Sequence, residues 1–540
     1  MKKVFENPSE LENLAKQELS IPPFLMMENA ARFLSDFIIS IIKKGKINQI
    51  VILCGKGNNG GDGFALARLL CTAYENPPVT ILVPQMPVSA EAKTQFEMCQ
   101  KLAIHTVFSD EINTFLQNLA ADSQINSDFN DLYNFSDFKN QNNFSSFSSI
   151  IVDCLFGIGF HGELSKEFLQ IFDILNKIKA VKIACDIPSA LYFHADFTVT
   201  MGAHKTALFS DKAKAVCGTI IQAPLGIPSN VFESFLPPDA FLLEMSDAKL
   251  PFRKNKSAHK GTYGHTSVFA CQKSGAAILA ATSALNFGSG LTSLIKTSFS
   301  DLDQFKISPE LMINDSIPAK TTAIVLGPGF CEYEKSVLIF DDILKWFTMV
   351  ENPAIVLDAG VFGHRDFIPF LQNINSVLNA KIVLTPHLLE MSRFLEHLNN
   401  FFPEKFQDFD KNDFSVQTLA NNPNKKIALS KKIMQIFPNV TIVIKSADTF
   451  IAAENQVFIC DEGRQNLAKG GSGDVLAGLI GSLLAQRYSA KESAITGVLA
   501  HANASKKFGG EAYDLTPEKL INEISNLKSI KINLQSIYNH

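Results

Sequence analysis

Short apolar runs separated by helical patterns limit the fold of this chain more than any other feature of its sequence. In the first part of the chain these runs are Gln49–Cys54, Val79–Val83, Ile150–Leu155 and Val181–Cys185. Each run is apolar nearly throughout instead of alternating between apolar and polar residues, which is typical of parallel strands covered on both faces. The sequence therefore predicts an α/β fold built on a parallel sheet.

The second part of the chain repeats the pattern. Its apolar runs are Thr266–Ala270, Ala323–Leu326, Ala354–Leu357, Ile382–Leu384 and Thr441–Ile444. Between the two series lies the stretch 234–260, which contains Pro237, Pro238 and several basic residues. A chain of 540 residues is too long for a single core. We predict two α/β domains, residues 1–245 and 250–540, that divide near 245–255 and fold independently.

Two stretches have a biased, polar composition. Residues 113–149 are rich in Asn, Ser, Phe and Asp, and residues 398–426 form a second patch of low complexity. Such composition favours loops or partly ordered excursions over packed elements. We predict that both stretches are loops.

Composition excludes several classes of partner. A net charge of −5 and 46% hydrophobic residues leave no basic excess for nucleic acid, and no apolar run is long enough to span a bilayer. The beginning of the chain turns polar before an apolar segment develops, so it does not read as a signal peptide and we expect a cytoplasmic protein. The nine cysteines form no C-x-x-C pair, and Cys54, Cys154 and Cys185 lie in or beside apolar runs, which predicts buried, reduced thiols. The eleven histidines show no metal-ligand spacing.

A glycine-rich segment, Lys469-Gly-Gly-Ser-Gly-Asp474, precedes an apolar helical pattern. Gly470, Gly471 and Gly473 allow backbone turns in which successive N–H groups converge on one anion at a helix start. An aspartate beside a bound phosphate suits removal of a proton from a hydroxyl that attacks phosphorus. The alternative is an ordinary glycine-rich helix start with a capping carboxylate.

A second glycine-rich segment, Gly-Lys-Gly-Asn-Asn-Gly-Gly-Asp-Gly at 55–63, lies between a predicted strand and the helical pattern 64–70. This order predicts a phosphate-bearing ligand at the helix start. A dinucleotide dehydrogenase usually has an acidic residue at the end of the next strand, but Val79–Val83 runs into Pro84 and Gln85. Polar side chains within the segment itself could instead bind a sugar or an ion.

Two more polar segments, 152–162 and 185–190, also follow predicted buried strands. Asp153 or Asp186 alone would more often be a turn or helix cap than a catalyst. Because ligand sites of open parallel sheets form at the carboxyl ends of strands, three such segments together favour a binding site there.

With these segments, the run Leu-Met-Met-Glu-Asn-Ala-Ala at 25–31 and Asp186-Ile-Pro-Ser189 resemble the epimerase domain of the bifunctional NAD(P)H-hydrate repair enzymes, over about residues 1–230. The resemblance implies a Rossmann-like three-layer α/β domain that interconverts the R and S epimers of the hydrated dinucleotides NADHX and NADPHX. Ala190 departs from the glycine that the family usually has after this motif.

The resemblance also implies roles for individual residues. Asp186 is the expected catalytic carboxylate, because epimerisation at C6 requires proton transfer to open and reclose the carbinolamine. Potassium would be held by Asn59, Asp153 and Ser189. The substrate would be bound by Asn58, Asn59, Gly60, Gly61, Asp62, Gly157, Ile158, Gly159, Phe160, His161, Gly162, Glu163 and Asp186.

The second half resembles the dehydratase domain of the same family, a ribokinase-like α/β fold, over about residues 250–530. The matching segments are 259–265, 274–281, 287–292, 327–329, 384–387, 445–449 and 469–474. The resemblance implies dehydration of the S epimer at the expense of ADP, with Mg²⁺, in which the C6 hydroxyl is phosphorylated and phosphate then leaves, giving NADH or NADPH and AMP. ATP is a possible alternative to ADP.

In this domain Asp474 is the expected catalytic base. The remaining substrate residues implied by the resemblance are Ala276, Gly329 and His387, together with Asp474. The adenine nucleotide would be held by Lys445, Ser446, Ala447, Asp448, Thr449 and Gly473. Without the resemblance, His387 would equally well be a turn residue at a strand end. Departures from the family pattern lie at Gly360, Leu389 and Ser446.

Two other functions use the same features. A small-alcohol kinase of ribokinase-like fold would share the glycine segment at 469–474, but it has no use for the first domain. A non-catalytic nucleotide-binding scaffold would not require the carboxylates Asp186 and Asp474 beside the ligand. We therefore expect NADHX, NADPHX and ADP as partners of a homo-oligomeric enzyme, with neither nucleic acid nor membrane.

Overall fold

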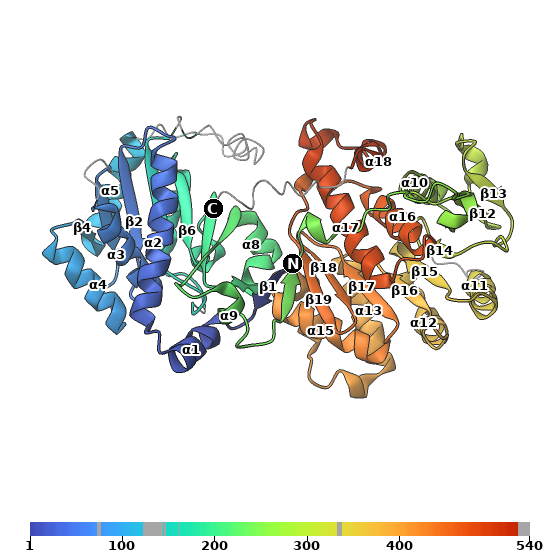
Figure 1. The fold of residues 1–540 in the computed structure, drawn as a ribbon, viewed down its shortest axis with the longest axis horizontal. Coiled ribbons are helices and arrows are strands. Elements are labelled where there is room, and N and C mark those ends of the chain that lie inside the picture. Colours follow the sequence, from blue (N-terminus) through green and yellow to red (C-terminus); the bar gives the residue numbers. More distant parts are fainter. Residues whose placement is uncertain (73–76, 123–143, 145–146, 161, 332–336, 528–540) are drawn as a thin grey trace. The chain divides into compact units, whose positions relative to one another are not determined.

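The computed structural model describes residues 1–72, 77–122, 144, 147–160, 162–331 and 337–527 (Figure 1). The chain divides into two compact units, Lys3–Pro238 and Asp239–His540, the latter joined by Met1 and Lys2. The division lies ahead of the predicted position at 245–255, because β10 (Ala240–Leu242) pairs with β19 (Gln456–Cys460) of the second unit. We call them the amino-terminal and carboxy-terminal units.

The amino-terminal unit contains a seven-stranded sheet with the order β4-β3-β2-β5-β6-β7-β9. All of its neighbouring strands are parallel. Its strands are β2 (Gln49–Cys54), β3 (Val79–Val83), β4 (His105–Phe108), β5 (Ser149–Cys154), β6 (Val181–Cys185), β7 (Phe197–Met201) and β9 (Thr219–Ala223). Beside this sheet, Val4 and Phe5 of β1 (Lys2–Phe5) pair in parallel with β8 (His204–Lys205).

Alternate residues of β2 enter two different cores, which explains why its sequence is apolar throughout. Ile50 and Ile52 pack with α2 (Pro23–Ile42), α3 (Asn58–Leu70) and α4 (Ala90–Lys101). Val51 and Leu53 pack with α5 (Ser109–Asp122) and α7 (Lys166–Lys177). The unit thus has three layers, as predicted. Its other helices are α1 (Pro8–Leu19), α8 (Asp211–Val216) and α9 (Ser229–Phe232).

The carboxy-terminal unit has its own sheet, in which the strands follow the order β13-β12-β11-β14-β15-β16-β17-β18-β19-β10. Besides β19 and β10 these are β11 (His265–Ala270), β12 (Leu291–Lys296), β13 (Met312–Asn314), β14 (Ala323–Leu326), β15 (Ala354–Leu357), β16 (Lys381–Leu384), β17 (Val440–Ile444) and β18 (Thr449–Ala453). The pairs β17–β18 and β18–β19 are antiparallel, which the sequence analysis did not anticipate.

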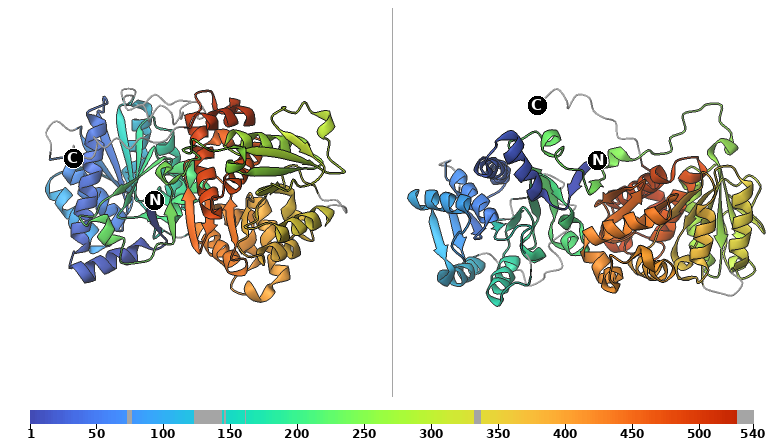
Figure 2. Two further views of the ribbon diagram at one scale, coloured as in Figure 1. Left: turned by 45° about the vertical axis from the view of Figure 1, so that its right-hand side comes forward. Right: turned by 90° about the horizontal axis from the view of Figure 1, so that it is seen from below.

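Helices lie against both faces of each sheet (Figure 2). In the carboxy-terminal unit α10 (Ser274–Asn286), α16 (Ser472–Ala485) and α17 (Ala490–Lys507) share one core with the central strands. The other helices are α11 (Val337–Met349), α12 (Phe367–Asn375), α13 (Leu388–Phe401), α14 (Val416–Asn421), α15 (Pro423–Ile436) and α18 (Pro517–Ser525). The predicted two-domain α/β architecture is confirmed. No helix in the described part of the chain is long and apolar enough to cross a membrane.

Both predicted loops are wrong in part. The first, 113–149, begins inside α5, and residues 123–143 and 145–146 lie outside the described ranges. The second, 398–426, is largely helical. Its polar residues act as caps, with Ser415 capping α14 and Asn422 capping α15, while Phe414 and Leu419 are buried. Composition alone did not separate caps from loop residues.

Each unit has its own hydrophobic cores, so we propose that each folds by itself. Fragments 1–238 and 239–540 should each show a cooperative thermal transition when expressed separately. A fragment that starts at residue 250 lacks β10 and exposes the edge of β19, so it should melt at a lower temperature than 239–540. Non-cooperative melting of both 1–238 and 239–540 would contradict independent folding.

Candidate active sites

The first candidate site lies at the carboxyl ends of β2, β5 and β6. The glycine segment after β2 is not a loop throughout, because α3 already begins at Asn58. Asn59 and Asp62 are three residues apart in its first turns and therefore share one helix face. A Cβ on Gly60 would lie 1.8 Å from the carbonyl oxygen of Gly55, so this close approach of backbone requires glycine.

Asp153, at the end of β5, is fully buried and tied to Ser189. Its Oδ1 accepts hydrogen bonds from the Ser189 hydroxyl at 2.7 Å and the Leu155 N–H at 3.1 Å, and its Oδ2 accepts the Ser189 N–H at 2.8 Å. Burial raises the pKa of Asp153 to about 6, although these hydrogen bonds oppose the shift. The predicted pair Asp153 and Ser189 is thus brought together.

Asn59, Gly157 and Asp186 also lie side by side. A Cβ on Gly157 would be 3.2 Å from Oδ2 of Asp186 and 3.6 Å from Cβ of Asn59. Both amide atoms of Asn59 are buried without a hydrogen-bond partner in the described structure. A buried amide is costly to leave unpaired, so it points to a ligand at this position.

The other predicted residues of this site surround it less closely. Phe160 stacks on Phe156 with ring centroids 4.3 Å apart, and Gly159, Gly162 and Glu163 are exposed. Asn58 is exposed and Ile158 is half-buried. His161 lies outside the described residues.

Asp186 adopts a left-handed backbone conformation (φ +73°) directly after β6. Lys205 Nζ lies 2.5 Å from its Oδ1, and the Met201 N–H donates to the same oxygen at 3.3 Å. The Lys205 ammonium also donates to Thr200 Oγ1 at 2.9 Å and to the Met201 carbonyl at 3.0 Å, and its side chain is only 3% exposed. The sequence analysis missed Lys205, although it is the one Lys, Arg, Asp or Glu within residues 197–209.

Two further carboxylates face this ion pair. The pKa of Asp62 is raised well above its usual value, chiefly by burial and then by Asp186 and Glu12, against the opposing effect of Lys205. Burial also raises the pKa of Glu12, which belongs to α1 and was not predicted as a site residue. The Lys205 ammonium contacts Asp186, and its charge also opposes the raised pKa values of Asp62 and Glu12.

The second candidate site lies at the carboxyl ends of β14 to β17. Lys445 Nζ, just after β17, donates to Oδ1 of Asp358 at 2.7 Å, and the Thr385 hydroxyl donates to the same oxygen at 2.7 Å. A Cβ on Gly473 would be 3.2 Å from Lys445 Nζ, so the ammonium lies at the start of α16. Asp358, which is almost fully buried, was not among the predicted residues.

The glycine segment 469–474 forms the start of α16. Gly471 is the N-cap residue, with φ +94° and no side-chain capping bond, so a capping carboxylate does not explain Asp474. Asp474 lies in the first turn. Burial, and then the charges of Asp358 and Glu390, raise the pKa of Asp474 to about 6 against the opposing effect of Lys445. This is the value that suits a proton acceptor near neutral pH.

His387 and Glu390 form a reciprocal cap at the start of α13. His387 Nδ1 accepts the Glu390 N–H at 3.2 Å, and Glu390 Oε2 accepts the His387 N–H at 2.8 Å. His387 Nε2 also lies 3.1 Å from Glu390 Oε1, so both ring nitrogens contact Glu390 as the alternative role of a turn residue requires, while the ring remains 50% exposed. Burial raises the pKa of Glu390.

Gly329 and Ala276 are both connected to Lys273 by backbone hydrogen bonds. The Lys273 N–H donates to the Gly329 carbonyl at 3.2 Å, and the Ala276 N–H donates to the Lys273 carbonyl at 3.1 Å. Ala276 is half-buried in the first turn of α10.

The predicted nucleotide segment 445–449 forms the turn between β17 and β18. The Ser446 hydroxyl donates to the Asp448 carbonyl at 2.6 Å and accepts from Lys426 Nζ at 3.1 Å. Ala447 is exposed, and Thr449 begins β18.

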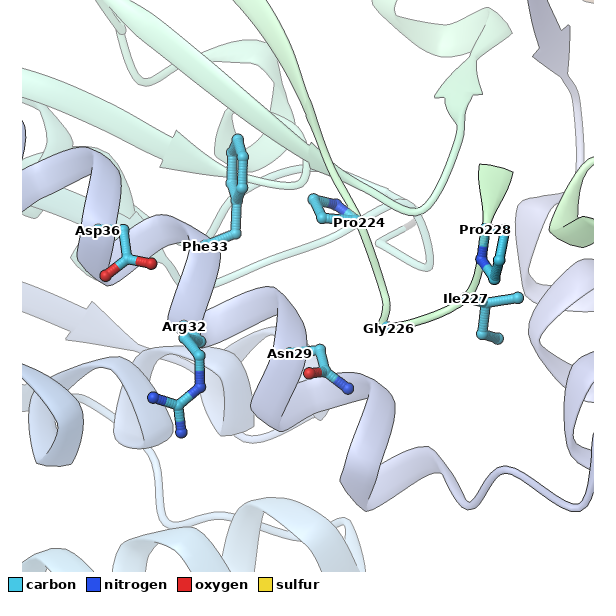
Figure 3. A pocket seen from close by; sticks show the side chains of 8 residues that line it. All are labelled: Asn29, Arg32, Phe33, Asp36, Pro224, Gly226, Ile227 and Pro228. Carbon is cyan, nitrogen blue, oxygen red and sulfur yellow. The ribbon is translucent and has the colours of Figure 1, made fainter. Parts of the chain in front are cut away.

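A cavity of about 470 Å³ lies apart from both sets of residues (Figure 3). It is lined by α2 and the segment after β9, namely Asn29, Arg32, Phe33, Asp36, Pro224, Gly226, Ile227 and Pro228. None of the predicted site residues lines it. Within the described ranges, no group of three or more His, Cys, Asp or Glu side chains is placed to hold a metal ion.

Comparison with known proteins gives matches in both units. The family model "YjeF-related protein N-terminus" matches residues 24–207, and the model "NAD(P)H-hydrate dehydratase" matches residues 270–526. A crystal structure of an ADP/ATP-dependent NAD(P)H-hydrate dehydratase from Bacillus subtilis is 22% identical, with a TM-score of 0.40 over 51% of this chain and 92% of that chain.

Curated relatives cover nearly the whole chain. A protein of Helicobacter pylori is 35% identical over 98% of this chain and 100% of its own length. One of Coxiella burnetii is 30% identical over 94% of this chain and 96% of its own. Both are named bifunctional NAD(P)H-hydrate repair enzyme Nnr. The chain therefore belongs to the family of bifunctional NAD(P)H-hydrate repair enzymes.

Proposed function

We propose that the protein epimerises R- and S-NAD(P)HX in its amino-terminal unit and dehydrates the S epimer at the expense of ADP in its carboxy-terminal unit. Family membership supports the two activities. The observation that carries the assignment of residues is that each site brings together a carboxylate beside or within a glycine segment and a lysine from another element. These are Asp186 with Lys205, and Asp474 with Lys445.

In the first unit Asp186 is the base that takes the C6 hydroxyl proton as the ring opens. Its Oδ1 is occupied by Lys205 and the Met201 N–H, whereas Oδ2 faces the space beside Gly157 and Asn59. Oδ2 is therefore the oxygen that exchanges the proton. Asp62, whose raised pKa favours the protonated form, gives a proton to the ring nitrogen as the C6–N bond breaks, and both protons return by the same routes when the nitrogen adds to the other face of the carbonyl.

In the second unit Asp474 takes the proton of the C6 hydroxyl as that oxygen attacks the β-phosphorus of ADP and AMP leaves. The N–H groups at the start of α16 and the Lys445 ammonium stabilise the charge on the transferred phosphoryl group. Phosphate then departs from C6, assisted by the lone pair of the ring nitrogen, and loss of a proton from the neighbouring C5 gives NADH or NADPH. Ala276, Gly329 and His387 line the substrate side, and residues 445–449 with Gly473 hold the nucleotide.

Magnesium would enter with the nucleotide phosphates, because Mg²⁺ in such sites takes one or two carboxylates and keeps phosphate and water ligands. The ion would supply charge compensation on the phosphates.

The assay that tests the proposal contains purified protein, racemic hydrated NADH, ADP and Mg²⁺, and follows the absorbance of reduced nicotinamide. Recovery of NADH from both epimers supports both activities. Recovery that stops when the S epimer is consumed would contradict epimerisation. Consumption of ADP without NADH would favour the alternative, a small-alcohol kinase.

We propose that potassium belongs to the substrate site of the first unit, held by Asn59, Asp153 and Ser189. Amide, carboxylate and hydroxyl oxygens suit a hard cation, and the unpaired Asn59 amide fits a missing ligand. Asn59→Ala should raise the KM for epimerisation and remove its dependence on K⁺ when K⁺ is replaced by tetramethylammonium. Dehydration of pure S epimer in the same samples is the control. Equal rates of wild-type epimerisation in both salts would contradict a potassium site.

Dehydration should depend on pH through Asp474. Because the pKa of Asp474 is raised to about 6, the ionised form that accepts a proton is present above this pH and is lost as the pH falls through it. The groups that face it are Asp358, Glu390 and Lys445. We expect kcat/KM for S-NADHX to fall about tenfold for each pH unit well below pH 6. A rate that stays constant from pH 7 to about 5 would contradict this role.

A further inference from the structure

His501 of α17 lies directly under the glycine segment of the second site. It is 8% exposed, and its Nε2 lies 3.0 Å from the carbonyl oxygen and 3.1 Å from the hydroxyl oxygen of Ser472. Ser472 itself is buried as the first residue of α16. His501 is not among the predicted site residues, although it contacts the backbone that is expected to meet the phosphoryl group.

The protonation of His501 follows from its surroundings. Burial, together with the charge of Lys445, lowers the pKa of His501 to about 4, so the imidazole is neutral at neutral pH and carries one N–H. A carbonyl oxygen can only accept, so the hydrogen bond to Ser472 places this hydrogen on Nε2. The Ser472 hydroxyl can then only accept from Nε2, and its own hydrogen points elsewhere.

The hydrogen bond from His501 to the Ser472 carbonyl orients the whole peptide group between Ser472 and Gly473. The Ser472 carbonyl and the Gly473 N–H belong to the same planar peptide group, so holding the carbonyl also fixes the direction of the N–H on the opposite side. Gly473 lies next to Lys445 Nζ. The preceding residues Gly470 and Gly471 have no side chain that could restrain this peptide.

We infer that His501 is a positioning residue for phosphoryl transfer: its Nε2–H clamps the Ser472–Gly473 peptide so that the Gly473 N–H meets the transferred phosphoryl group. The inference rests on the proposed dehydration at this site. A preorganised N–H contributes to transition-state stabilisation because it needs no reorientation during the reaction. Loss of the clamp should therefore slow the chemical step more than it weakens nucleotide binding.

The test uses the full chain and the single-turnover rate of NADH formation from S-NADHX and ADP, with ADP affinity and melting temperature measured in parallel. His501→Leu should lower this rate by about tenfold or more, with ADP affinity within about threefold of wild type. His501→Gln, which keeps an N–H donor at similar reach, should restore most of the rate. Ser493→Ala, on the same helix and away from the segment, is the matched control.

Ser472→Ala distinguishes the contact of His501 with the Ser472 carbonyl from its contact with the hydroxyl, because the variant loses only the hydroxyl. A clearly smaller loss of rate in Ser472→Ala than in His501→Leu supports the clamp on the peptide, and a loss as large as that of His501→Leu would overturn it. An unchanged rate in His501→Leu, or equal losses in the Leu and Gln variants, would also overturn the inference. If wild type forms no NADH with ADP, the proposed function fails and the inference fails with it.

Discussion

Asp474→Ala should abolish the nucleotide-dependent recovery of NADH and leave the exchange between R- and S-NADHX intact. In the proposed mechanism this carboxylate, whose pKa is raised, takes the hydroxyl proton, so its removal should cost a factor of about 10² or more in rate. Asp358 does not replace it, because Oδ1 of Asp358 is already held by Lys445 and Thr385.

The measurement is NADH absorbance with pure S epimer and ADP, combined with magnetic resonance of the epimer ratio in the absence of nucleotide. Asp474→Asn is the matched variant, since it keeps the shape and loses the base. Both variants should lose dehydration activity to the same extent, and both should epimerise the substrate at the wild-type rate. Dehydration at the wild-type rate in either variant would remove Asp474 from its assigned role.

Asp186→Asn should slow epimerisation by a factor of about 10² or more while dehydration of pure S epimer continues at the wild-type rate. The amide can still face Lys205 through its oxygen, but the position of Oδ2 beside Gly157 can no longer take up a proton. The change therefore acts on the chemical step more than on substrate binding.

The rate of approach of pure R epimer to the equilibrium mixture gives the measurement. Asn59→Ala provides the comparison, because loss of a ligand to the cation should appear mainly in KM, whereas loss of the base should appear in kcat. An Asp186→Asn enzyme that retains its kcat would show that another group exchanges the proton. Asp62 would then be the first candidate, because its carboxyl faces the same ion pair.

Local sequence was sufficient for the architecture and for the positions of the glycine segments. Apolar runs without alternation predicted strands buried on both faces, and β2 shows why, since Ile52 and Val51 enter different cores. Glycines followed by a helical pattern predicted α16 and its anion-binding start. Both signals arise from residues that are close in the chain, so they can be recognised without a structure.

The partners of the predicted carboxylates were decided by the tertiary structure alone. Lys205 reaches Asp186 from β8, and Asp358 reaches Lys445 from the end of β15. The partners of each pair lie in different elements, and no local sequence pattern links them. These contacts depend on which strands are neighbours in the sheet and on how the segments that follow them turn. His501 likewise approaches Ser472 only because α17 packs against α16. The sequence by itself therefore determined the two α/β domains and the positions of the two glycine segments, whereas sheet order and helix packing decided which charges face them.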